Sequence, residues 1–154
     1  MKPLDDKSRE MTLALLAQIE DMSLTTVRPD GYPQATIVSF ASDGLTLYVG
    51  IGLDSQKAHN VRLNDKVSLT LYKPQPDWQQ TKSLSLSGRA AIIADAEEMA
   101  RAAACLLHRF PNLPKLQDTS GLPWAGALFL RITPEVISLL DYTKGFGHSE
   151  TYTV

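Results

Sequence analysis

The chain has 154 residues, enough for one domain with a real core, and its 44% hydrophobic and 21% charged residues are ordinary for a soluble globular protein. A net charge of −2 leaves no broad basic field for nucleic acid or an anionic membrane, so any anion site must be local. Cys105 is the only cysteine, which excludes an internal disulfide. The start, MKPLDDKSRE, lacks the apolar segment of a signal peptide, and no apolar run is long enough to span a bilayer. We therefore expect a cytoplasmic protein.

The first element is predicted to be a helix over residues 6–20, because its apolar side chains recur at helical spacing and form one stripe. The segment that follows, MSLTTVRPDGYPQATIVSFASDGLTLYVGI, reads as three strands separated by the turn signals Pro29-Asp30-Gly31 and Ser42-Asp43-Gly44. These connections are too short for parallel crossovers, so the pattern predicts an antiparallel meander.

Two further helices are expected. A short one covers residues 54–64, with Asp54 as its N-cap. A longer one begins at Asp95, where Glu98 completes a capping-box pattern, and ends before Pro111.

The rest of the chain reads mainly as strands. DKVSLTLYKP and KSLSLSGRAAIIA are the fourth and fifth strands, and NLPKLQDTSGLPW is a long irregular loop. AGALFLRITPEVISLLDY gives one or two closing strands interrupted at Pro134, and TKGFGHSETYTV is a polar tail.

Many strands with few, short helices favour a mainly β fold, a barrel of antiparallel strands with helices packed outside or plugging one end. We expect a single domain over residues 1–154, with a core of about 20–141 and a tail over 142–154.

The stretch GIGLDSQK carries the clearest chemical signal. Gly50-Ile51-Gly52 is not a dinucleotide fingerprint, because Ser55 stands where the third glycine belongs and the strands are antiparallel. Ser55, Gln56 and Lys57 instead fall in the first turn of a helix, whose free backbone N–H groups and positive dipole end attract an anion. The hydroxyl and the ammonium group add donors for a phosphate. The alternative is a solvated helix start, with Asp54 as the cap and Lys57 in water.

The strand QATIVSF is mostly apolar on both faces, and each face carries one hydroxyl. A flat aromatic cofactor lying on such a strand would find apolar contact, with backbone groups for its ring edge. The alternative is an ordinary barrel strand.

The remaining polar residues form no catalytic constellation. His59, His108 and His148 are scattered without metal-ligand spacing, and Cys105 with His108 is too little for a zinc site, so no metal is predicted. Two glycines flank Phe146 beside His148, which suggests a loop holding an aromatic ring and an imidazole against something. A flexible tail is the alternative.

Several short motifs occur in a recognisable order and spacing over about residues 20–105. They are Asp30-Gly31-Tyr32-Pro33, Ser55-Gln56-Lys57, Asn60-Val61-Arg62-Leu63-Asn64, Val67-Ser68-Leu69 and the stretch LSGRAAIIADAEE. In this arrangement the chain resembles the pyridoxamine 5′-phosphate oxidase-like family, the FMN-binding split barrels.

The resemblance implies a homodimer of antiparallel split β-barrels, with two FMN molecules bound at the subunit interface. Ser55 and Lys57 would hold the phosphate with Gln56 beside them, and Asn60 would support the phosphate end. The other cofactor-binding positions it implies line or approach the isoalloxazine ring: Thr36, Ile37, Val38, Ser39, Gly50 and Ile51.

The implied activity is that of an FMN-dependent oxidoreductase, with a small-molecule substrate or a nicotinamide electron donor. The closing stretch has Arg131 as its only arginine, whereas the true pyridoxamine-phosphate oxidases end in an arginine- and tryptophan-containing strand, which argues against vitamin B6 oxidation. No catalytic acid is assigned, although His148 is the most interesting candidate. The alternatives are a flavin store or redox sensor without turnover, a haem- or deazaflavin-binding relative with His148 or His108 as a haem ligand, and an interaction module without a cofactor.

Overall fold

The computed structural model of the protein describes residues 1–113 and 126–154. Most of the predicted irregular loop after the second long helix therefore lies outside the described residues. The elements are, in chain order, β1 (Lys2–Pro3), α1 (Asp6–Gln18), β2 (Asp21–Val27), β3 (Pro33–Ser39), β4 (Ala41–Asp43), β5 (Thr46–Gly52), α2 (Gln56–Leu63), β6 (Lys66–Tyr72), the 3₁₀ turn η1 (Trp78–Gln80), β7 (Lys82–Ile92), α3 (Ala96–Arg109), β8 (Ala127–Asp141), the 3₁₀ turn η3 (Tyr142–Lys144) and β9 (Ser149–Thr153).

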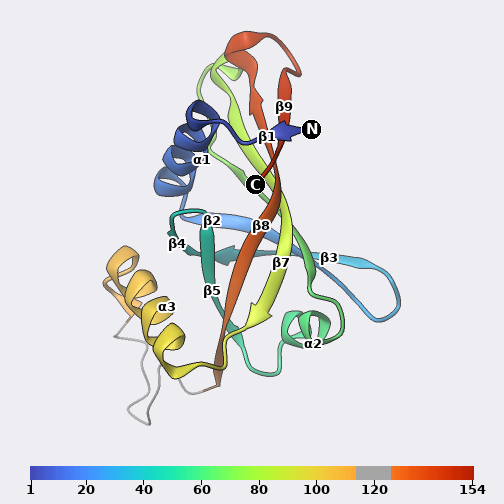
Figure 1. Ribbon diagram of the computed structural model, residues 1–154, viewed down its shortest axis with the longest axis vertical. Coiled ribbons are helices and arrows are strands. Elements are labelled where there is room, and N and C mark those ends of the chain that lie inside the picture. Colours follow the sequence, from blue (N-terminus) through green and yellow to red (C-terminus); the bar gives the residue numbers. More distant parts are fainter. Residues whose placement is uncertain (114–125) are drawn as a thin grey trace.

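The strands form one mainly antiparallel sheet in the order β1-β9-β8-β7-β6-β2-β3, and β5 pairs with both β4 and β8. The sheet curls but does not close, which confirms the predicted mainly β, split-barrel fold class. The long strands β7 and β8 run along the molecule, with α1 beside them near one end and α2 and α3 near the other (Figure 1).

Strand β8 has two different partner strands along one of its edges, one for each half of the strand. Residues 127–132 pair with β5, and residues 136–140 pair with β9, while β7 pairs along nearly the whole strand. The predicted interruption at Pro134 is wrong, since β8 continues through it. The strands instead shift register between Ser87 and Gly88, opposite Pro134, whose nitrogen cannot donate to a ladder.

The predicted meander is correct for its first hairpin and wrong for its third strand. β2 and β3 pair over their full lengths, but the chain then forms the extra strand β4 and returns as β5, which pairs with β8 instead of β3. Burial explains this course. Leu47 and Val49 face the main core, whereas Tyr48 faces a second cluster under α3, so β5 is covered on both sides.

The end of the chain, expected as a polar tail, contains a strand. β9 pairs with β8 on one side and with β1, in parallel, on the other. Tyr152 is almost fully buried in the main core. Because Tyr152 is the one large apolar side chain of β9 and its neighbours are polar, the alternation was too weak to predict this strand from the sequence.

Two of the helices begin at aspartate caps. Asp5 caps α1, and Asp95 caps α3 as the sequence predicts, by accepting a 2.8 Å hydrogen bond from the Glu98 N–H. α3 packs on the second cluster through Ala102 and Leu106. Within residues 1–113 and 126–154, none of the helices has the length and apolar character needed to cross a bilayer.

Candidate functional site

The turn from β5 into α2 differs in one detail from the prediction, because Ser55 and not Asp54 is the N-cap of α2. Its Oγ accepts a 3.3 Å hydrogen bond from the Ala58 N–H, and its own N–H donates to the Gly52 carbonyl at 3.1 Å. The backbone N–H groups of Gln56 and Lys57 consequently have no acceptor among the described residues. The hydroxyl proton of Ser55 is also free to donate, since this cap uses only the oxygen.

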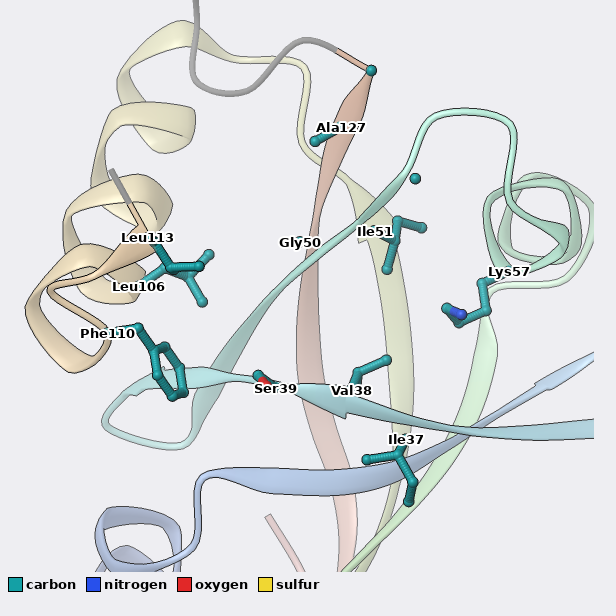
Figure 2. Close-up of a pocket in the computed structure, with 12 residues that line it drawn as sticks. Ile37, Val38, Ser39, Gly50, Ile51, Lys57, Leu106, Phe110, Leu113 and Ala127 are labelled. Carbon is teal, nitrogen blue, oxygen red and sulfur yellow. The ribbon is translucent and has the colours of Figure 1, made fainter. Parts of the chain in front are cut away.

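A pocket of about 570 Å³ opens between this turn, strand β3 and helix α3, and we call it the β3–α3 pocket (Figure 2). Its described lining residues are Ile37, Val38, Ser39, Gly50, Ile51, Gly52, Lys57, Leu106, Phe110, Leu113, Gly126 and Ala127. The volume lies in the range of small-molecule and cofactor sites. Six of the ten predicted site residues therefore meet in one cavity.

Lys57 supplies the charge of the β3–α3 pocket. It is half-buried at the start of α2, and its side chain extends toward Ile51 and Val38 (Figure 2). It forms no ion pair or hydrogen bond with any described residue, and no other charged side chain from this part of the chain lines the pocket. An ammonium group without a counter-ion, beside free N–H groups, favours an anion.

Strand β3 forms one wall and has a free edge. It ends the strand order and pairs only with β2 among the described strands, so half of its backbone N–H and C=O groups are available to a ligand. Val38 is buried while Ile37 is 70% exposed, an unusual position for an isoleucine that lines a pocket. Apolar side chains and an unpaired strand edge suit a flat heteroaromatic ring.

The other four predicted residues lie outside the pocket lining. Asn60 is fully buried; its Nδ2 donates to Thr26 Oγ1 at 2.9 Å and to Gln34 Oε1 at 3.2 Å, and its Oδ1 accepts from Gln56 Nε2 at 2.9 Å. Because this network ties α2 to β2 and β3, Asn60 and the Gln56 side chain hold the helix start in place and do not face the cavity. Ser55 borders the cavity as the cap described above.

Thr36 is the remaining residue of this group. Its Oγ1 is buried and has no hydrogen-bond partner among the described residues, which is rare for a buried hydroxyl.

Helix α3 contributes residues that the sequence reasoning missed. Leu106, Phe110 and Leu113 project from this helix and its end toward the strands, across the pocket from Lys57 (Figure 2). The sequence predicted the helix from its cap, but a helix assignment does not reveal which of its apolar side chains line a cavity. Gly52, Gly126 and Ala127 complete the missed set, and no local signal marked them.

Arg109 fixes the end of α3. Its guanidinium donates to the Leu16 carbonyl at 2.9 Å and to the Ile19 carbonyl, at the C-terminal end of α1. It also lies over the rings of Phe40 and Phe110, at 4.7 and 5.9 Å from their centroids. Burial lowers the pKa of Arg109 from its ordinary value, against the opposing effect of Glu20 and Asp21. The result is a fixed position for Phe110 in the pocket wall.

The histidines and Arg131 lie elsewhere. His148 borders a separate cavity of about 230 Å³ near the start of α1, and no described histidine lines the β3–α3 pocket. Phe146 packs on Trp78 and Tyr142, not on the imidazole. Arg131 Nη1 donates to Glu98 Oε1 at 2.6 Å, so its charge is already paired.

Neither Cys105 nor a metal cluster adds chemistry to this region. Burial raises the pKa of the Cys105 thiol, with Asp43 adding to the shift, so the reactive thiolate is disfavoured. Over the described residues, no group of three or more His, Cys, Asp or Glu side chains could hold a metal ion.

An open antiparallel barrel, with a pocket between an edge strand and a helix start that carries an unpaired lysine, defines the fold as a split barrel. The chain belongs to the pyridoxamine 5′-phosphate oxidase family, whose model matches residues 9–138. None of the curated proteins matches the sequence.

Solved structures share this fold at low identity. A candidate pyridoxamine 5′-phosphate oxidase from Listeria innocua is 26% identical, with a TM-score of 0.69 over 86% of this chain and 98% of that one. A haem-binding protein from Mycobacterium smegmatis is 16% identical, with a TM-score of 0.79 over 94% of this chain and 57% of that one. The haem storage protein HutZ of Vibrio cholerae is 20% identical, with a TM-score of 0.68 over 86% of this chain and 91% of that one.

Proposed function

We propose that this protein binds FMN in the β3–α3 pocket and acts as a flavin-dependent oxidoreductase on a small molecule. The observation that carries the proposal is the unpaired Lys57 beside the free N–H groups at the start of α2, at one end of an otherwise apolar pocket. FMN carries a flat ring and a phosphate at the two ends of a ribityl chain, and each end finds its complement there.

The roles of the residues follow from their positions. Lys57 and the Ser55 hydroxyl bind the phosphate together with the N–H groups of Gln56 and Lys57, and Asn60 supports them from behind through its buried network. Ile37, Val38 and Ser39 contact one face of the ring, and Gly50 and Ile51 allow close approach from β5. Thr36 offers its unpartnered hydroxyl from the same strand.

FMN supplies hydride and electron transfer once bound, and the protein's part is to bind, orient and electrostatically tune it. No described side chain is assigned as a proton donor, because the histidine favoured at first, His148, lines a different cavity.

The active form in this proposal is a homodimer with the flavin at the subunit interface. The 70% exposed Ile37 and the free edge of β3 both lie at the pocket and are features that a partner subunit would cover. A cytoplasmic location fits a chain with one cysteine.

The test is to purify the protein without added cofactor, record its visible absorption spectrum, and weigh the small molecule released by heat. FMN at about one per chain is the expected result. A colourless protein that also takes up no added FMN would reject the proposal.

Haem is a second candidate because two of the solved structures that share the fold are named as haem proteins. The chemistry of the pocket does not favour it, since no histidine among the described residues lines the cavity to bind the iron. The same spectrum separates the two, because haem gives an intense band near 400 nm that flavin lacks.

A further inference from the structure

The β3–α3 pocket has two chemically different ends, and this inference rests on the proposed function. The cation and the free N–H groups lie at the α2 end, which the phosphate of FMN would occupy. The α3 end lies across the strands and is a wall of Leu106, Phe110 and Leu113 (Figure 2). A substrate has to use the end that the phosphate leaves free.

Among the described residues, the α3 end offers no group that would compensate for a buried charge. Its described side chains are hydrocarbon or aromatic, with Ala127 of β8 and Ser39 of β3 as neighbours. Two arginines at α3 already have partners: Arg109 donates to carbonyl groups of α1, and Arg131 donates to Glu98. Transferring a phosphate or carboxylate to such a wall costs several kcal/mol without a partner, whereas an apolar ring is stabilised there.

Phe110 gives the wall its shape. The Arg109 guanidinium, which is held by hydrogen bonds to α1, lies over its ring at 5.9 Å from the centroid and supports it from one side. A fixed aromatic side chain prefers a flat partner in stacked or edge-on contact.

We infer that the substrate of this protein is an uncharged, flat, apolar molecule that binds against Phe110 and Leu113, and that phosphorylated substrates are rejected. Phe110 is thereby a specificity-determining residue. The apolar lining of the α3 end thus distinguishes the protein from an oxidase of a phosphorylated vitamin.

The test compares 1-naphthol with 1-naphthyl phosphate, which share a flat ring system and differ by the charged group. Binding of each to the FMN-loaded protein is measured by equilibrium dialysis, together with the change in flavin absorption on binding. We expect 1-naphthol to bind at least about tenfold more tightly than 1-naphthyl phosphate, because it has no charge that would be buried without a partner.

Three variants locate the contact. Phe110→Ala should weaken 1-naphthol binding to the FMN-loaded protein by about tenfold through lost apolar contact. Leu113→Lys should raise the affinity for 1-naphthyl phosphate by about tenfold, because it adds a cation to the wall. This variant also serves if Phe110→Ala folds poorly. Phe146→Ala is the matched control, since its ring is 81% exposed in a different cluster.

The outcomes distinguish a failure of this inference from a failure of the proposed function. A protein that holds FMN but binds both naphthalenes equally, or prefers the phosphate, overturns the substrate class and leaves the flavoprotein intact. Unchanged 1-naphthol binding in Phe110→Ala overturns the inference that the substrate contacts Phe110. A protein without FMN in its visible spectrum overturns the proposed function and this inference with it.

Discussion

At the scale of single residues, the charge of Lys57 is the feature that the proposed function depends on most. We expect Lys57→Ala to reduce FMN affinity by about 1.5–3 kcal/mol, the range for hydrogen bonds to charged groups, or roughly ten- to a hundredfold. Titration of the apoprotein, followed by quenching of flavin fluorescence, measures it. Lys73→Ala, an exposed lysine that does not line the pocket, is the control. Equal dissociation constants for the wild type and Lys57→Ala would disprove the phosphate assignment.

Which of the candidate residues face the cavity was only partly predictable. The apolar pattern of β3 and the lysine of the Ser-Gln-Lys motif identified residues that do meet there. Gln56 came from the same motif and Asn60 from the resemblance, and in the structure their side chains join a hydrogen-bond network away from the cavity. A sequence shows that an amide is present but not which way it points, because that depends on partners more than twenty residues away in the chain.

At the scale of secondary structure elements, Ser55 has two roles that a single substitution can separate. Aspartate is as good an N-cap as serine, so Ser55→Asp should leave the melting temperature nearly unchanged. It places a carboxylate where the FMN phosphate is proposed to bind, and like charges repel, so affinity should fall by at least about tenfold. Thermal unfolding of the apoprotein and FMN titration are the two measurements. A variant that keeps wild-type FMN affinity would show that Ser55 only caps the helix.

The bulge between β7 and β8 gives a second prediction at this scale. A Cβ on Gly88 would lie 2.2 Å from the Thr133 carbonyl oxygen, a contact that only backbone movement relieves. Gly88→Ala should therefore lower the free energy of unfolding by about 1–3 kcal/mol, the usual range for overpacking. Urea unfolding measures this.

Gly52→Ala is the control for that substitution, because its Cβ would meet the Ser55 Cβ and N at an ordinary 3.7 and 4.0 Å. A destabilisation of the same size in both variants would contradict the steric explanation.

Elements with strong local signals were predictable, and those defined by distant partners were not. The apolar stripe located α1 to within two residues, a capping residue located the start of α3, and a turn glycine located the β2–β3 hairpin. β5 leaves the expected meander, and β9 forms at all, because β8 offers both of them an edge. The pairing of β8 is set by residues far away in the chain, which no local pattern encodes.

At the scale of the whole molecule, the exposed strand edge predicts the assembly. If the partner subunit covers β3, a charge at Ile37 should disrupt the interface, so Ile37→Glu should elute as a monomer and bind FMN more weakly. Light scattering after size-exclusion chromatography gives the mass. Leu63→Glu is the control, because Leu63 is 73% exposed and does not line the pocket. A wild-type protein that is itself monomeric while holding FMN would contradict the interface.

The two-part pairing of β8 has a consequence for how the protein opens. Detachment of β9 exposes the amides of residues 136–140 on one edge, while those of 130–132 stay enclosed between β5 and β7. Deuterium uptake along this single strand should therefore occur in two kinetic blocks. Because only the first half borders the pocket, bound FMN should slow exchange there and leave the second half at its own rate. One strand would then report separately on ligand binding and on local unfolding of the chain's end.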